Sequence, residues 1–227
     1  KKSLDEWLDH TVNVLAVGSP RFEYLKSIAA SKRDVSNFNK KIGSIEHKRN
    51  VTYIASGAKA VDNRELIIAL KMLREKLPND INLIIKSHPR GEYDIKKEIK
   101  RIFLKNELSG TVFIKNEIDF YEILLNSDVV ITRASTGMLE AIAVDIPTLQ
   151  VNFTDLPLPK QYDLSSFGWK EPIDDADVMI KEVLFILSDK KRRDEVIKKQ
   201  RWLKNRVLKN FGRCGEVIAE TIVDICN

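Results

Sequence analysis

Residues 129–153 read VVITRASTGMLEAIAVDIPTLQVNF and contain the pattern that decides the fold. The apolar and β-branched run from Val129 to Thr132 predicts a buried strand. Small polar residues follow it, and Met138 to Val144 has the apolar spacing of a helix. Pro147 then leads into another strand, Thr148 to Asn152. A strand, a helix and a second strand in this order are typical of a parallel sheet covered by helices.

The same alternation extends through the rest of the chain. Strands are predicted at Val51 to Ser56, Ile81 to Lys86 and Thr111 to Ile114. Helices are predicted at Asn63 to Lys76 behind an N-cap at Asp62, Asp94 to Leu104, Phe120 to Asn126, Val178 to Leu187, Lys190 to Val207 and Gly215 to Ile225. We therefore expect an α/β fold, a Rossmann-like parallel sheet flanked by helices and completed by C-terminal helices.

The first 50 residues have a different character. Leu4 to Asp9 predicts a short helix and Val12 to Val17 a strand, whereas Ser31 to Asn50 is polar and basic like a linker. We expect residues 1–45 to be the end of an N-terminal domain with its linker, and residues 46–227 to be the main domain. Because the chain starts at Lys1 without a methionine, we also expect a fragment that lacks an N-terminal part.

Composition restricts the class of protein. Hydrophobic residues make up 43% of the 227 residues and charged residues 31%, which is ordinary for a folded globular protein. The net charge of +5 favours anionic partners. Many of its cations lie in the predicted helix Lys190 to Val207, where a solvated face explains them, so nucleic-acid binding is not expected. Cys214 and Cys226 have no metal-binding spacing.

Several well-known motifs are absent from the sequence. It has no P-loop, no G-x-G-x-x-G and no Cys/His metal cluster, which argues against a P-loop NTPase, a dehydrogenase and a zinc enzyme. No Ser-His-Asp order with a nucleophile elbow is present either. No apolar run is long enough for a membrane span. We expect no metal and no cofactor.

The loop after the strand at residues 129–132 is the strongest candidate site. Unpaired N–H groups of Ser135, Thr136 and Gly137 at a helix N-terminus would attract an anion, and Arg133 would add a fixed charge. Glu140, one turn further, would accept hydrogen bonds from ribose hydroxyls. A simple helix cap would explain Ser135 or Thr136 alone, but the combination favours a phosphate or nucleotide site.

Other candidates follow the remaining strands, because ligands of open parallel sheets bind at the carboxyl ends of the strands. His88 and Arg90 flank a proline after the second predicted strand and suit a diphosphate. Gly57 would let the backbone approach the pyrophosphate, although turns need glycine anyway. Asn116 and Glu117 are candidates for contacting the base, and an ordinary polar loop explains them equally well.

Three stretches resemble one known group of enzymes. Residues 129–153 look like the nucleotide-sugar motif in the C-terminal half of GT-B glycosyltransferases, such as those that make peptidoglycan and the lipid A disaccharide. IIKSHPRGEYD at Ile84 to Asp94 resembles a segment of CDP-glycerol glycerophosphotransferases, and AVGSPRFEYL at Ala16 to Leu25 resembles a turn that leaves the N-terminal domain. The tyrosine-serine-serine of the glycerophosphotransferases is absent, and Arg133 to Gly137 replaces the aspartate-serine-glycine-glycine of UDP-N-acetylglucosamine 2-epimerases.

The resemblance implies a function and a set of roles. It implies an inverting, metal-independent glycosyltransferase of cell-surface polysaccharide or glycolipid synthesis, with a CDP-glycerol-type glycerophosphotransferase, a UDP-sugar 2-epimerase and a non-catalytic nucleotide-binding module as alternatives. It places the diphosphate at Ser135, Thr136 and Gly137, with the ribose at Glu140 and phosphate or leaving-group contacts at His88 and Arg90. Expected partners are a nucleotide-sugar donor, a glycan or lipid-linked acceptor and the missing N-terminal domain, which would supply the catalytic base. The expected location is the cytoplasm, with peripheral contact at the inner face of the membrane.

Overall fold

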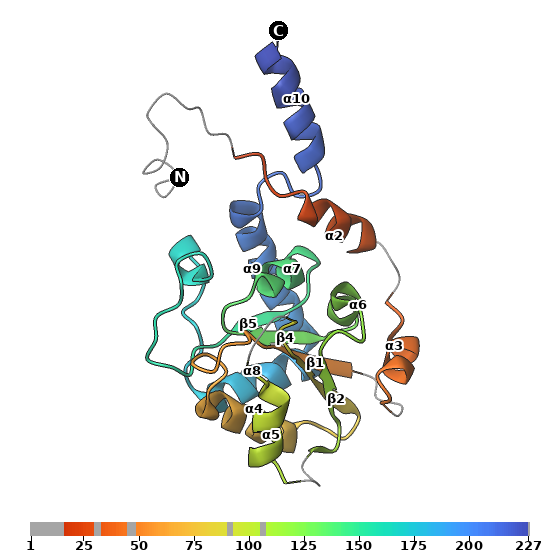
Figure 1. The fold of residues 1–227 in the computed structure, drawn as a ribbon, viewed down its shortest axis with the longest axis vertical. Helices are drawn as coiled ribbons and strands as arrows, with labels where there is room; N and C mark the ends of the chain where they lie inside the picture. The colour runs from red at the N-terminus through yellow and green to blue at the C-terminus, as the bar shows by residue number, and fades with distance from the viewer. Residues whose placement is uncertain (1–15, 30–32, 45–48, 90–92, 105–107, 227) are drawn as a thin grey trace.

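A parallel sheet of five strands forms the centre of the molecule (Figure 1). The computed structural model describes residues 16–29, 33–44, 49–89, 93–104 and 108–226. The strands are β1 (Arg49–Ile54), β2 (Ile81–Lys86), β3 (Thr111–Ile114), β4 (Val129–Thr132) and β5 (Thr148–Gln150), in the spatial order β3-β2-β1-β4-β5. The predicted α/β class with a Rossmann-like sheet is confirmed.

One face of the sheet carries α4 (Arg64–Lys76), α5 (Ile95–Ile102) and α8 (Ala176–Ser188) (Figure 1). Alternate strand residues such as Val51 and Tyr53 point to this side and are fully buried. Parallel strands that are covered on both faces must be apolar on both, which explains the nearly unbroken apolar runs in the sequence.

The opposite face is covered by α3 (Val35–Lys41), α6 (Phe120–Leu125) and α7 (Thr136–Ala143). Phe38 of α3 is buried against Ile84 of β2. Within residues 31–50, which were predicted to be a linker, the structure therefore places a short polar helix that packs against the sheet through an aromatic side chain. The boundary near residue 45 stays a prediction.

Three further α-helices complete the described part of the fold. The first is α2 (Arg21–Ala29), which packs on α7 through the buried Leu25. The second is α9 (Lys190–Val207), which runs past α7 and ends below the third, α10 (Cys214–Cys226), the helix that projects from the body in Figure 1. Leu203 of α9 is buried, whereas the indole of Trp202 is 47% exposed under the Arg206 guanidinium.

The ends of several elements differ slightly from the prediction. Asn63, not Asp62, caps α4 by accepting a hydrogen bond from the Leu66 N–H at 3.1 Å. The Asp62 carboxylate is instead buried and accepts hydrogen bonds from the Tyr53 hydroxyl and the Gly57 N–H. The predictions for Leu4 to Asp9 and for residues 12–15 fall outside the described residues.

Candidate functional site

A cleft of about 500 Å³ opens at the carboxyl ends of β1, β2 and β4. The chain order of the sheet reverses between β1 and β4, and open α/β sheets bind their ligands at such a switch point. The volume lies within the range of pockets for small molecules. The cleft is lined by Arg21, Ile54, Ala55, Lys86, Ser87, His88, Pro89, Phe120, Ser135, Thr136, Gly137 and Glu140.

The N-terminus of α7 forms one wall of the cleft. Ser135 caps the helix, since its hydroxyl accepts a hydrogen bond from the Gly137 N–H at 3.2 Å. Gly137 is thus not one of the unpaired donors that the sequence predicted. Within the described part of the chain, the backbone N–H groups of Ser135 and Thr136 have no partner. They remain available to an anion at this helix end.

Gly137 has a packing role in addition to its place at the cleft. A β-carbon at this position would lie 2.7 Å from the Phe120 ring and 3.1 Å from Ile54. Only glycine allows α7 to approach the end of β1 and the start of α6 so closely. The glycine that the sequence assigned to a ligand is therefore also required to close the wall.

Glu140 is buried one turn into α7, and Arg21 and Tyr121 bind it. The Arg21 Nε lies 2.5 Å from Glu140 Oε1, and the Tyr121 hydroxyl lies 3.2 Å from the same oxygen. The second oxygen, Oε2, is buried and has no hydrogen-bond partner among the described residues. Burial raises the pKa of Glu140, although Arg21 opposes this shift. Because Glu140 lines the cleft, its unsatisfied carboxylate oxygen is a candidate acceptor for a ligand hydroxyl.

The segment after β2 supplies the basic groups on the opposite side. The Lys86 ammonium is nearly buried and donates to the carbonyls of Ser87 at 2.8 Å and Lys115 at 2.6 Å. Burial lowers its pKa. His88 is exposed at the cleft, and the predicted Arg90 lies outside the described residues.

The side chain of Arg133 does not line the cleft. Its guanidinium donates to Asn152 Oδ1 at 2.7 Å and to the Leu156 carbonyl at 2.6 Å, so it holds the loop that follows β5. Burial lowers the pKa of Arg133. Arg133 thus stabilises the loop after β5 in this structure, and its assignment to the phosphate stays a prediction.

Arg133→Met is accordingly expected to lower the free energy of unfolding by about 2 kcal/mol, because the Leu156 carbonyl and the Asn152 amide lose a charged donor. Nucleotide affinity should stay within about twofold of the unmodified chain, because the Arg133 side chain bonds the loop after β5 and does not line the cleft. Urea denaturation and calorimetric titration measure the two quantities. A tenfold loss of nucleotide affinity would show that Arg133 takes part in nucleotide binding.

The remaining sequence candidates do not line the cleft. Gly57, at a φ of 77°, donates its N–H to the Asp62 carboxylate. Glu117 turns its carboxylate back on its own loop, where hydrogen bonds from the backbone of Glu117, Lys115 and Asn116 hold its pKa below the usual value. The assignment of Asn116 and Glu117 to the base stays a prediction.

A second cavity of about 210 Å³ lies between β5, α8 and α9. Its walls include Leu149, Trp169 and Val196, and the Glu182–Arg192 ion pair borders it. It lacks contact with the N-terminus of α7 and with the ends of β1 and β2. The larger cleft is therefore the better candidate for a phosphate ligand.

The sequence did not single out Arg21 and Phe120, which also line the cleft. Lys86, by contrast, carried a usable signal, because it ends a strand two residues before His88. Arg21 is more than a hundred residues away from Glu140 in the sequence, and only the packing of α2 on α7 brings the two together.

The all-parallel sheet and the cleft at its switch point define a Rossmann-like α/β protein. Comparison with protein-family models gives a more specific result: the model for CDP-glycerol:poly(glycerophosphate) glycerophosphotransferase matches residues 8–150. The chain belongs to this family. No curated protein sequence matches the chain.

Solved structures share the fold at low sequence identity. The wall teichoic acid polymerase TagF is 18% identical with a TM-score of 0.59, over 96% of this chain and 53% of that one. A UDP-GlcNAc 2-epimerase from Neisseria meningitidis bound to UDP-GlcNAc is 13% identical with a TM-score of 0.63, over 97% and 57%. MnaA of S. aureus, in a co-structure with UDP, is 14% identical with a TM-score of 0.67, over 100% and 58%. The chain thus spans little more than half the length of these structures.

Among the described helices, none combines sufficient length with sufficient apolar character for a membrane span.

Proposed function

We propose that this chain is the donor-binding part of a transferase that takes glycerol phosphate from a CDP-linked donor for a cell-surface polymer. Membership in the glycerophosphotransferase family supports this choice over a sugar donor. A TagF structure obtained with CDPG provides a precedent on the same fold. The observation on which the proposal mainly rests is the cleft, where the open N-terminus of α7 lies beside a buried carboxylate with one free oxygen.

The chemistry of the proposed donor matches the two sides of the cleft. The N–H groups of Ser135 and Thr136 would bind the pyrophosphate, and Glu140 Oε2 would accept a hydrogen bond from the ribose. Transfer of glycerol phosphate breaks the bond between the bridging oxygen and the β-phosphorus, so CMP leaves and the acceptor hydroxyl forms the new P–O bond. His88, exposed at the same cleft, is placed to offset the charge that develops on that leaving group.

Other parts of the reaction would lie outside this chain. We propose that the acceptor-activating base comes from a segment beyond these residues, since the chain spans little more than half the length of the structures that it matches. The same proposal includes a polymer or lipid-linked acceptor. It places the protein in the cytoplasm at the inner face of the membrane, with the cations of α9 towards anionic lipid and no metal in the cleft.

Calorimetric titration of the chain with CDP, UDP, GDP and TDP, each with and without EDTA, tests the proposal. We expect CDP to bind at least about tenfold more tightly than the others, because a site that hydrogen-bonds one base leaves polar groups unpaired with another. EDTA should leave the affinity unchanged.

Each other result favours a different function. A preference for UDP would support a sugar transferase or an epimerase in place of the CDP-linked donor. Weak binding of every nucleotide with a steep salt dependence would indicate a general anion-binding surface. Absence of nucleotide binding would contradict the proposed function.

A further inference from the structure

Arg21 of α2 presents free donors to the cleft that neither the sequence nor the family match assigned to a ligand. Its Nε is held by Glu140 Oε1 at 2.5 Å and lies 3.2 Å from the Tyr121 hydroxyl. Its two terminal nitrogens, Nη1 and Nη2, have no partner among the described residues. About half of the side chain, 53%, is exposed, and it lines the same cleft as Ser135 and Thr136.

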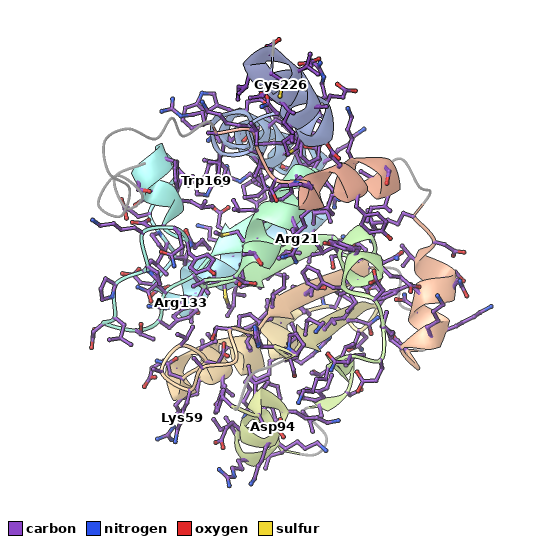
Figure 2. The ribbon with its side chains drawn as sticks, turned by 45° about the horizontal axis from the view of Figure 1, so that its top comes forward. Arg21, Lys59, Asp94, Arg133, Trp169 and Cys226 are labelled. Carbon is purple, nitrogen blue, oxygen red and sulfur yellow. The ribbon has the colours of Figure 1, made fainter. Side chains whose placement is uncertain are left out.

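Contacts with α7 and with the segment from α9 to α10 hold α2 in place. Leu25 is buried with Ala143 of α7 and Leu208 beyond α9. Glu23 accepts a hydrogen bond from the Gly215 N–H at the start of α10, and the carbonyl of Val17 accepts one from the Asn210 side chain at 3.1 Å. Figure 2 shows Arg21 where α2 crosses α7. The guanidinium is therefore oriented before any ligand arrives.

Two other cations of this region, Lys86 and Arg133, already have partners in the protein. The Lys86 ammonium is already bound to two backbone carbonyls, and Arg133 is committed to the loop after β5. A guanidinium whose Nε is occupied still has the edge formed by Nη1 and Nη2, and that edge matches two oxygens of one phosphate group.

We propose that Arg21 is a ligand of the donor pyrophosphate, held in place by Glu140 while Glu140 Oε2 binds the ribose. This inference rests on the proposed function, because it takes the cleft to be the nucleotide site. Helix α2, which lies in the expected N-terminal segment, would then contribute directly to donor recognition. The alternative is that Arg21 only orients Glu140, in which case it would affect the ribose and not the phosphates.

The two roles predict different affinities for the variant Arg21→Gln. We expect the affinity for CDP to fall about 20-fold, the size typical of a lost charge-assisted pair, while the affinity for cytidine falls less than about threefold. Calorimetry measures CDP, and NMR titration measures the weak binding of cytidine. The matched control is Arg206→Gln, an exposed arginine of α9 that stacks on Trp202 and lies outside the cleft.

Each outcome bears on one of the two proposals. Equal losses for CDP and cytidine would overturn the phosphate role of Arg21 and leave an orienting role. Unchanged CDP affinity would overturn any role of Arg21 while the proposed function stands. If the unmodified chain binds neither CDP nor any other nucleotide, the proposed function fails, and the inference fails with it. Thermal unfolding of the ligand-free variant at an unchanged midpoint shows that the fold is retained.

Discussion

Glu140→Gln lowers the affinity for CDP by about 30-fold in the expected result, which corresponds to about 2 kcal/mol for one hydrogen bond to a charged acceptor. The substitution keeps the size of the side chain but removes the charge that pairs with Arg21 and the strong acceptor at Oε2. Calorimetric titration at neutral pH measures the change. Glu220→Gln, at an exposed position on α10, is the control.

The same variant is expected to keep its stability, because burial makes the charged form of Glu140 unfavourable. The pKa of Glu140 is raised above the usual 4.5 in the folded state, so the native protein binds the proton more tightly than the unfolded chain. The contribution of this group to stability is full below the unfolded value and is lost as the pH rises through the folded value. At neutral pH, Glu140→Gln therefore removes the unfavourable free energy of burying this charge.

The pH dependence of binding has the opposite sign. Since the proposed ribose contact needs the carboxylate, the affinity for CDP should fall as the pH drops through the raised pKa of Glu140. Glu140→Gln should lose this particular dependence. A variant that binds CDP as tightly as the unmodified chain would remove Glu140 from the site, and a large loss of stability would show that its charge holds the fold together.

Asp128→Ala is expected to lower the free energy of unfolding by about 3 kcal/mol, the lower end for loss of one partner of a buried pair. The carboxylate is almost fully buried at the start of β4. It accepts hydrogen bonds from the Arg33 guanidinium at 2.7 and 2.9 Å and from the Asn50 N–H at 2.8 Å. The loss lies at the lower end because Arg33 is one third exposed and can be hydrated once its partner is gone.

Urea denaturation, followed by circular dichroism, measures this change. Asp80→Ala is the matched control, because Asp80 is exposed in the turn before β2 and should matter little. The loss should concentrate where α3 joins the sheet, so backbone amides of residues 33–44 should exchange hydrogen faster in Asp128→Ala. Equal stability of the two variants would show that the Asp128–Arg33 pair does not contribute to holding α3 on the sheet.

The sheet was predictable from local patterns. Val129 to Thr132, Ile81 to Lys86 and Thr111 to Ile114 appear as strands at the predicted bounds, since each is a short apolar run closed by a turn. β5 ends two residues before the predicted Asn152, and β1 begins two residues before Val51. Such shifts are expected, because hydrogen bonds to neighbouring strands, not side-chain type, decide where a strand stops.

The site was only partly predictable. His88, Ser135, Thr136, Gly137 and Glu140 were identified because they follow strand ends, and the structure brings all five to one cleft. Arg133 was assigned to the same cleft from its position in the chain. Its side chain points to the loop after β5, a direction that the spacing of residues does not contain.

The sequence by itself determined the class of fold, the order of strands and helices, and the loop at the N-terminus of α7, because hydrophobic periodicity and capping residues are local properties of the chain. Only the tertiary structure decided that Arg21 forms an ion pair with Glu140 and that α3 packs against the sheet. Those contacts join residues far apart in sequence, and they depend on how side chains of several helices pack against one another in three dimensions.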